Sequence, residues 1–251
     1  MAIRYGLVFG WLSIIGMGWG SVYEASAGMI GTPLTIYPRH TWVGGIEGNV
    51  INRELTLDTG DSPDIHLTEV LFRGTYGVLN RANVFLTVGV VDDDFKIADY
   101  YNGVELDFRS DQAMAYGGGF KWTVYEISDV LFGVGGQYER FSLVGDKSIN
   151  PIPPSTTPFA DGKLNWQEFR FFAGAQFKNI PYFVPYGGIY LTKVLGDLSF
   201  SQTTVPETTV EENQFVGLFY GGDFKLWKVI LSAEIRLIAE SSVAFSLQYP
   251  F

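Results

Sequence analysis

The last nine residues of the chain, 243–251, read VAFSLQYPF and alternate between large apolar side chains and small or polar ones. Successive side chains of a β-strand point to opposite faces, so this segment has one apolar face and one face that tolerates water. A helical period does not fit the pattern. The end of the chain therefore predicts a strand that separates an apolar environment from a more polar one.

The same period of two recurs along most of the chain. In the segment 114–124, for example, Met114, Tyr116, Phe120 and Trp122 share one face, while small or polar residues occupy the other. Ten segments of this kind are expected as strands, with ends uncertain by a few residues. They are 40–57, 65–78, 83–101, 104–124, 129–143, 164–178, 183–197, 213–226, 229–238 and 242–251.

The composition limits the classes of protein that this chain can belong to. Hydrophobic residues make up 47% of the 251 positions and charged residues 18%, yet no apolar run approaches the roughly 20 residues of a membrane-spanning helix. The chain has no cysteine, which excludes disulfides and zinc-thiolate sites. A formal net charge of -10 without a cluster of Lys and Arg argues against a nucleic-acid partner.

The N-terminus has the pattern of an export signal. Arg4 is followed by the apolar stretch 5–20 and by the small residues Ala-Ser-Ala at 25–27, the order that a secretory signal peptide shows. We expect residues 1–27 to be removed and the mature domain to comprise 28–251. The alternative is an uncleaved anchor, which the short and glycine-broken apolar stretch disfavours.

Short and long connections alternate between the expected strands, as in barrels that cross a membrane. The pair Asn102-Gly103 signals a tight hairpin, so the third and fourth strands are expected to project as a ribbon. The last outer turn, 239–241, is short. The short connections are 79–82, 125–128, 179–182 and 227–228, and the long polar ones are 58–64, 144–163 and 198–212.

A soluble sandwich or lipocalin-like barrel would also have one apolar face, directed inward. A barrel whose apolar face meets lipid is favoured instead, because the apolar faces are too bulky for the interior of a closed ten-stranded barrel. Their large residues include Phe169, Phe171 and Phe177. Small residues and charges of both signs suit a narrow lumen. The expected fold is all-β: a closed antiparallel up-and-down transmembrane β-barrel of about ten strands, with eight or twelve also possible. The expected lumen charges are Glu47, Glu69, Arg73, Lys121, Glu139, Glu168, Arg170, Asp223, Lys225, Glu234 and Arg236.

Aromatic side chains are expected at the two headgroup levels of the membrane. Trp166 is placed near the long-loop end by its position in the chain. Six further aromatic residues are expected near the end with the short turns: Trp42, Trp122, Tyr182, Trp227, Tyr249 and Phe251.

With its export signal, alternating connections and terminal aromatic strand, the chain resembles the bacterial outer-membrane β-barrel proteins, and its size is similar to opacity-like, OmpA-like and OmpW-like barrels. The resemblance implies a place in the bacterial cell outer membrane, contact with outer-membrane lipid and lipopolysaccharide, and assembly by the barrel-assembly machinery. A proline, Pro250, at the penultimate position departs from the usual pattern of such terminal strands. The residues implied as the assembly signal are Val243, Phe245, Leu247, Tyr249 and Phe251.

The candidates for chemistry are few. His66 lies near Asp64, with Asp58, Asp61 and the acidic run 92–94 expected at the same rim, a faint likeness to the Asp/His sites of omptin proteases. A hydrolase of the lipid A deacylase type would need a Ser held beside a His, and no such pair stands out in the sequence. The other histidine, His40, is not part of this Asp/His group. The run 92–94, with Asp99, Glu105 and Asp107, could hold a cation through oxygens, but it lacks EF-hand spacing. We therefore expect no enzyme, catalytic residue, metal or cofactor.

Two functions remain open from the sequence. In the favoured one, the barrel is a structural or interaction scaffold whose lumen is plugged by salt bridges and whose external loops meet partners. In the alternative, the same charges line a narrow porin-like channel for small solutes or ions. The sequence names no ligand and no oligomeric state.

Overall fold

The computed structural model describes residues 37–58, 62, 64–100, 104–110, 112–151, 162–178, 180, 182–200, 207–212 and 214–251. No helix in these ranges has the length and apolar character needed to span a membrane. The strands are β1 (Trp42–Leu57), β2 (Asp64–Leu79), β3 (Ala82–Tyr100), β4 (Val104–Ser110), β5 (Ala113–Ile127), β6 (Val130–Pro151), β7 (Gly162–Phe177), β8 (Phe183–Phe200), β9 (Thr208–Glu212), β10 (Val216–Leu226), β11 (Val229–Leu237) and β12 (Ser241–Pro250).

These strands make ten antiparallel passes around one closed wall. β4 and β5 both pair with β3 and β6, so they are two pieces of one broken strand. β9 and β10 likewise both pair with β8. β1 closes the wall by pairing with β12, from Val43 opposite Pro250 to Asn52 opposite Ser241. The expected antiparallel barrel of about ten strands is thus confirmed.

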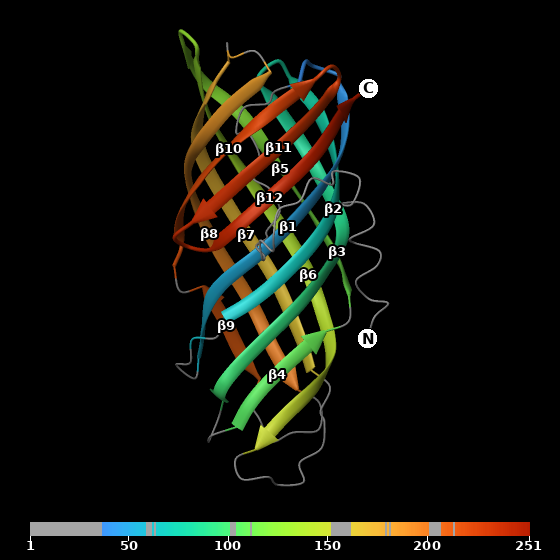
Figure 1. Cartoon of the computed structure of the whole chain (residues 1–251), viewed down its shortest axis with the longest axis vertical. Coiled ribbons are helices and arrows are strands. Elements are labelled where there is room, and N and C mark those ends of the chain that lie inside the picture. The colour runs from blue at the N-terminus through green and yellow to red at the C-terminus, as the bar shows by residue number, and fades with distance from the viewer. Residues whose placement is uncertain are drawn as a thin grey trace, which may run out of the picture.

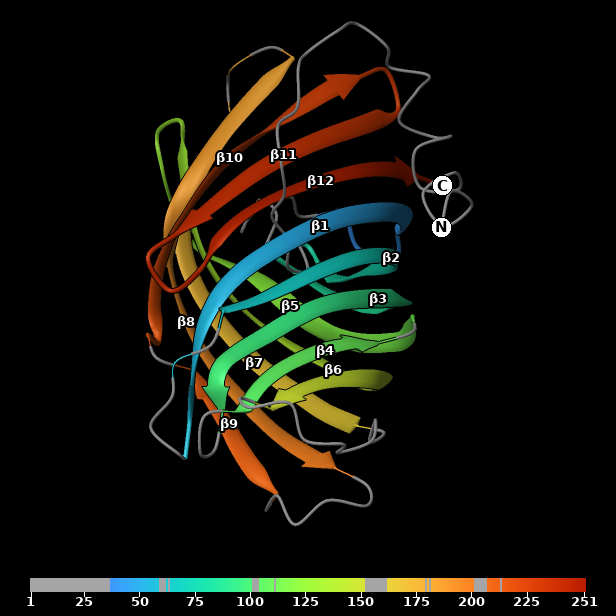
Figure 2. The ribbon, with the colours of Figure 1, turned by 60° about the horizontal axis from the view of Figure 1, so that its bottom comes forward.

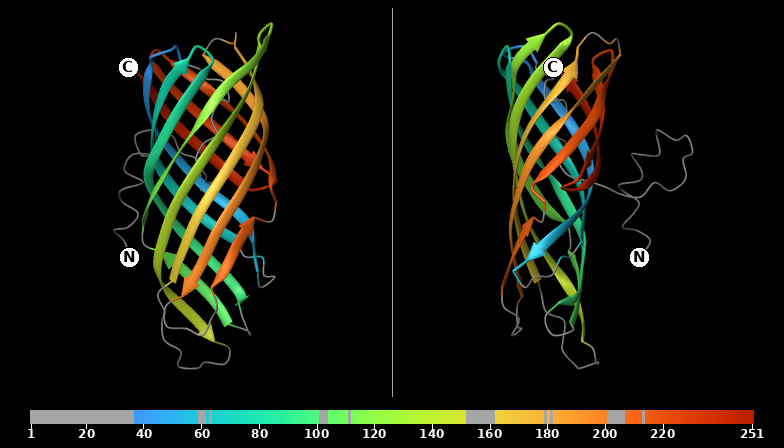
Figure 3. Two further views of the ribbon diagram at one scale, coloured as in Figure 1. Left: turned by 180° about the vertical axis from the view of Figure 1, so that it is seen from behind. Right: turned by 90° about the vertical axis from the view of Figure 1, so that its left-hand side faces the viewer.

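The barrel is tall, with its strands tilted across the long axis (Figures 1 and 3). The turns β2–β3, β5–β6, β7–β8 and β10–β11 gather at one end with the C-terminus, and we call it the short-turn end. β4 and the far ends of β6, β7 and β8 lie at the other end, which we call the long-loop end. In Figure 1 the short-turn end is at the top.

The wall does not have the same number of strands along its whole height. β11 has 9 residues and β12 has 10, whereas β6 has 22, and the β11–β12 turn lies about halfway along the wall (Figure 1). Beyond that turn β9 pairs directly with β1, with Leu55 opposite Glu212 and Leu57 opposite Val210. The wall therefore narrows from ten strands to eight, and Figure 2 shows β9 beside β1.

Several of the expected boundaries were wrong. β6 continues to Pro151, β8 continues to Phe200, and β9 lies in the segment 198–212, so much of the two longest expected loops is strand. β4 pairs with β6 as well as with β3, and it is therefore part of the wall rather than half of a free ribbon. Residues 101–103, which include the expected hairpin turn, lie outside the described residues.

Candidate functional site

The half of the lumen nearest the short-turn end is lined by charged side chains. All of the expected lumen charges are buried except one: Glu47, Glu69, Arg73, Lys121, Glu139, Glu168, Arg170, Asp223, Glu234 and Arg236. The exception is Lys225, which is exposed near the end of β10. The period of two places it on the face of Asp223, but the wall ends there and water reaches it, so its assignment to the buried lumen was wrong.

A single carboxylate joins the arginines at the centre of the lumen. Glu240, in the β11–β12 turn, contacts Arg53, lies 2.8 Å from Nη1 of Arg236 and 4.0 Å from Nη2 of Arg170. It also accepts a hydrogen bond of 3.0 Å from the Ser242 hydroxyl. The turn that ends the short hairpin thus inserts its carboxylate where three strands present a guanidinium.

Further carboxylates surround these arginines. Arg53 lies 3.1 Å from Glu168 and 3.7 Å from Glu212, and Glu168 also contacts Arg170. Nε of Arg236 lies 3.2 Å from Glu234. Buried charges are costly unless they are paired, and each arginine here lies within 4.0 Å of at least one carboxylate. We call the set the Glu240 cluster: Arg53, Arg170, Arg236, Glu168, Glu212, Glu234 and Glu240.

Three members of the Glu240 cluster are not among the predicted lumen charges. Arg53 could have been found, because it is six residues from Glu47 and the period of two puts both on one face of β1. Glu240 was assigned to an external turn and Glu212 to an external loop. Their burial depends on the hairpin ending inside the wall, which no local pattern reveals.

A second group of charges lies closer to the short-turn end. Nε of Arg73 is 2.9 Å from Glu47, and the guanidinium carbon of Arg73 is 4.2 Å from the centre of the Phe85 ring. The Lys121 ammonium is 6.0 Å from the same ring. Toward the same end, the Tyr37 hydroxyl donates a hydrogen bond of 2.7 Å to Gln248. This end of the lumen is therefore also occupied by side chains.

The half of the lumen nearest the long-loop end is apolar, in contrast to the charged lumen predicted from the sequence. Trp166, predicted at a membrane interface, is 1% exposed and stacks on Phe141 with ring centres 5.6 Å apart. The prediction failed because its position in β7 faces the lumen. The apolar lumen cluster is Ile51, Leu55, Leu57, Ile65, Leu67, Leu71, Val91, Ala115, Phe141, Leu143, Leu164, Trp166, Val194, Leu198 and Val210.

The outer surface changes polarity at the same height, in the opposite sense. On β7 the outward side chains are Phe171 and Phe169 toward the short-turn end, and then Gln167, Asn165 and Lys163 toward the long-loop end. The same change occurs after Val50 on β1 and Val90 on β3, and after Tyr138 on β6, where only Val144 of the described outward side chains is apolar. Only the short-turn half therefore has the apolar exterior that hydrocarbon requires.

The height of this apolar band fits a membrane. On β5 it extends from Met114 to Val124, which is about 33 Å along the strand at about 3.3 Å per residue. A tilt of roughly 40° reduces this to about 25 Å, the height of the apolar band of outer-membrane barrels. The long-loop half, with apolar side chains inside and polar ones outside, stands beyond the band in water with a core of its own.

Exposed aromatic rings mark the short-turn edge of the apolar band. Trp42 packs on Tyr76 with ring centres 4.6 Å apart, and the backbone N–H of Phe251 donates a hydrogen bond of 2.9 Å to the carbonyl of Trp42. Rings at this level suit the headgroup region of a bilayer. The exposed set comprises Trp42, Trp122, Tyr182, Trp227, Tyr249 and Phe251.

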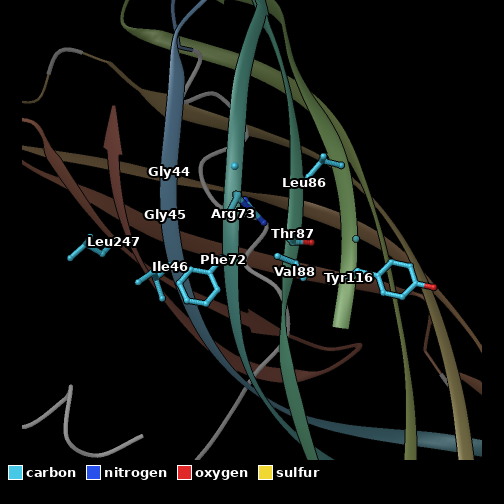
Figure 4. Close-up of a pocket in the computed structure, with 12 residues that line it drawn as sticks. Gly44, Gly45, Ile46, Phe72, Arg73, Leu86, Thr87, Val88, Tyr116 and Leu247 are labelled. Atoms are coloured by element: carbon cyan, nitrogen blue, oxygen red, sulfur yellow. The ribbon is translucent and has the colours of Figure 1, made fainter. Parts of the chain in front are cut away.

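A hollow of about 760 Å³ lies on the wall formed by β12, β1, β2, β3 and β5. Figure 4 shows Phe72 and Arg73 leaving β2 on different sides, and Phe72 is exposed while Arg73 is buried. The exposed rim is apolar, and a Cβ built on Gly74 would have nothing within 4 Å. The hollow is therefore a depression of the lipid-facing band at a position without a side chain. Its rim is formed by Ile46, Phe72, Leu86, Val88, Tyr116 and Leu247.

The two histidines lie in opposite halves of the barrel. His66 and Asp64 are exposed on the outer surface of β2, and His66 contacts Asn52. His40 lies at the short-turn end, where Nδ1 is 2.7 Å from the Tyr76 hydroxyl. Within the described ranges, no group of three or more His, Asp or Glu residues could hold a metal ion. Asp58 and Asp92 are exposed, and the side chains of Asp61, Asp93, Asp94, Asp99, Glu105 and Asp107 lie outside the described residues.

Comparison with known proteins finds no matching family model and no matching curated protein. Similar solved structures are outer-membrane β-barrels. The translocator domain of the autotransporter NalP from Neisseria meningitidis has 8% identity and a TM-score of 0.48, over 86% of this chain and 90% of that one. An outer membrane channel from Pseudomonas putida F1 has 8% identity and a TM-score of 0.43, over 94% and 100%. The outer membrane protease OmpT from Escherichia coli has 9% identity and a TM-score of 0.44, over 84% and 97%.

Proposed function

We propose that this protein is a non-conducting scaffold of the bacterial outer membrane that displays a closed β-structure beyond the membrane. The observation that carries the proposal is the filled lumen, with the Glu240 cluster in its centre and the apolar lumen cluster in its long-loop half. Partners are then met by the polar outer surface and the loops of the long-loop half.

The apolar lumen cluster is the stronger of the two barriers. Its side chains are almost fully buried, and Trp166 and Phe141 stack across neighbouring strands β7 and β6. Water in such a space would lack the two to four polar partners that hold a buried water molecule. An ion passing through would in addition lose its hydration shell, at a cost of several kcal/mol or more.

The specific observation that favours the alternative, a narrow channel, is the polar lining of the short-turn half of the lumen. Gln137, Gln176 and Asp223 line it together with the charged residues. That half alone resembles a narrow polar pore. Conduction would then require the apolar lumen cluster to open, which an electrical measurement detects.

The test is single-channel recording of the refolded protein in planar bilayers, with folding checked by heat-dependent mobility on gels. We expect no stable open level for the wild type. A variant that replaces both Phe141 and Trp166 with Ser should give a measurable current, because the two largest rings of the barrier are removed. Stable wild-type openings would establish the channel and refute the scaffold.

We further propose that the protein is exported, that it is cleaved after Ala27, and that the barrel-assembly machinery recognises its last strand. Support comes from the N-terminal pattern and from β12, whose exposed face carries Phe245 and Leu247. N-terminal sequencing of the membrane-extracted protein should begin at Gly28. Retention of Met1 would contradict cleavage.

We do not propose an enzymatic activity. His66 and Asp64 are exposed on the outer surface of β2, and the described contact of the His66 ring is with the Asn52 side chain rather than with a nucleophile. A catalytic role for this rim would be detected as hydrolysis of peptide or ester substrates that an Asp64→Asn variant loses.

A further inference from the structure

Two buried carboxyl groups meet in the lumen outside the ion pairs described above. Glu69 on β2 is 1% exposed, Glu139 on β6 is 6% exposed, and the two carboxyl groups are hydrogen-bonded to each other. The described residues place no ion-pair partner within 4.0 Å of either group. Arg170 and Arg236 attract Glu139 from farther away, and both are already paired in the Glu240 cluster.

The surroundings of this carboxyl pair make two negative charges costly. On the lumen face of β2, Glu69 lies between Leu67 and Leu71, which both belong to the apolar lumen cluster. Of the charged residues that are buried in the described structure, seven are acidic and five are basic, and Glu212 of the Glu240 cluster adds another acid. Two ionised carboxylates in contact repel each other strongly in such a space. The pair therefore requires either a shared proton or a bound cation.

Two further oxygen atoms adjoin the pair, and neither has a hydrogen-bond partner in the described structure. Asn49, opposite Glu69 on β1, directs its amide nitrogen at the Glu69 carboxyl group over 3.4 Å and leaves Oδ1 without a partner. A half-turn of the amide exchanges its two atoms, so Oδ1 can also face Glu69. The Thr87 hydroxyl has no partner either. A Cβ built on Gly117 would lie 3.0 Å from Oγ1 of Thr87 and 3.2 Å from Cα of Glu139, so this hydroxyl flanks the second acid. Asn49 is 1% exposed and Thr87 is 3% exposed.

The chemistry of these atoms selects the kind of cation. Carboxylate, amide and hydroxyl groups all offer oxygen, which suits hard cations. Ca²⁺ takes roughly six to eight oxygen ligands in a flexible geometry and accepts water among them, whereas Mg²⁺ requires a near-ideal octahedron. Because the site has only two carboxylates, the remaining ligands are amide and hydroxyl oxygens and water. The charge of Ca²⁺ equals that of the ionised carboxyl pair.

We propose that Glu69 and Glu139 bind a calcium ion inside the lumen, with the carbonyl oxygen of Asn49 as a third ligand. The ion joins β2 to β6 at the boundary between the charged and the apolar halves of the lumen. It replaces the proton that the two carboxyl groups would otherwise share. The calcium site goes beyond the proposed function and does not depend on whether the barrel conducts.

The test uses the full-length protein folded in detergent micelles, freed of metal with a chelator and then dialysed against Ca²⁺ alone. Bound Ca²⁺ is counted by atomic emission, and the melting temperature is read from heat-dependent gel mobility. The test variant, Glu69→Gln, Glu139→Gln, removes both charges and keeps the side-chain shape. The control variant, Glu54→Gln, Asp64→Asn, removes two exposed carboxylates that face each other on the outer surface of β1 and β2.

We expect the wild type and the control variant to bind one more Ca²⁺ per chain than the test variant, with a dissociation constant of about 10⁻⁴ to 10⁻³ M, as in extracellular calcium modules. Ca²⁺ at ten times this constant should raise the melting temperature of both by roughly 3 to 6 °C. It should leave the test variant unchanged. Without Ca²⁺ the test variant should melt no lower than the wild type, because it has no opposed charges to neutralise. Asn49→Ala should weaken Ca²⁺ binding at least threefold.

Equal Ca²⁺ counts in the wild type and the test variant would overturn the calcium site. So would a wild type whose melting temperature does not respond to Ca²⁺, because a shared proton would then neutralise the carboxyl pair. Neither result bears on conductance, so failure of the calcium site is distinguishable from failure of the scaffold function.

Discussion

Replacing Arg53 with Met should destabilise the barrel more than any other single charge removal in the Glu240 cluster. Arg53 reaches carboxylates from three different parts of the wall, Glu168 on β7, Glu212 on β9 and Glu240 in the β11–β12 turn. Its side chain is fully buried. Methionine keeps much of the apolar stem and removes the charge, so the comparison isolates the ion pairs from the packing.

The magnitude follows from the charge balance of the cluster. Its three arginines and four glutamates have a formal charge of -1, and the Arg53→Met variant leaves -2 in a buried space. Breaking a buried ion pair by removing one partner costs about 3 to 5 kcal/mol. The unfolding equilibrium constant should therefore rise by about two to four orders of magnitude, at about 1.4 kcal/mol for each factor of ten.

A second substitution makes the prediction specific to charge. Adding Glu240→Gln to Arg53→Met returns the formal charge of the cluster to -1, so the double variant should be more stable than the sum of the two single effects by at least about 1 kcal/mol. Interactions of this size are normal between charged residues that touch. Loss of packing alone would give additive effects.

The assay is reversible urea unfolding from phosphatidylcholine vesicles, followed by tryptophan fluorescence and gel mobility. Arg140→Met serves as the matched control, because Arg140 is exposed on the outer surface of β6 and should change stability by no more than about 0.5 kcal/mol. A cost below about 1 kcal/mol for Arg53→Met, or additive effects in the double variant, would refute the view that the cluster is held by its charge balance.

Three further outcomes are expected. In the cysteine-free chain, a Leu86→Cys thiol in the apolar band should resist a membrane-impermeant maleimide in vesicles, whereas Glu54→Cys beyond it should react; equal labelling would misplace the membrane. A Gly89→Ala substitution should lower the stability of the barrel by about 1 to 3 kcal/mol, because the added Cβ would lie 2.0 Å from a backbone oxygen of β2. Gly74→Ala should be close to neutral in the same urea assay, because its added Cβ would have nothing within 4 Å. Deleting Phe251 should lower the yield of assembled barrel in the outer membrane well below that of a one-residue deletion at Ser155, because the Phe251 N–H donates a hydrogen bond to the carbonyl of Trp42 at the start of β1. Equal yields would contradict a role of the last residue in assembly.

The alternation of side chains indicated most of the strands, and together with the alternating short and long connections it predicted the closed antiparallel barrel. It also identified most of the buried charges. Strands have a period of two, so two charged residues separated by an even number of positions on one strand lie on the same face. Arg53 could have been found in this way. The apolar exterior of the short-turn half was equally accessible, since Phe169 and Phe171 alternate with Glu168 and Arg170.

Only the tertiary structure decided which face is inside at each height. A period of two separates two faces but cannot say which one meets lipid, water or the lumen, and along β7 the apolar face changes from outward at Phe169 to inward at Trp166 and Leu164. The place of Glu240 was likewise hidden, because it depends on β9 pairing with β1 beyond a hairpin that ends within the wall. The change of the inward face along β7 and the burial of Glu240 both depend on pairings between residues far apart in the chain. The polarity of a single segment cannot predict such pairings.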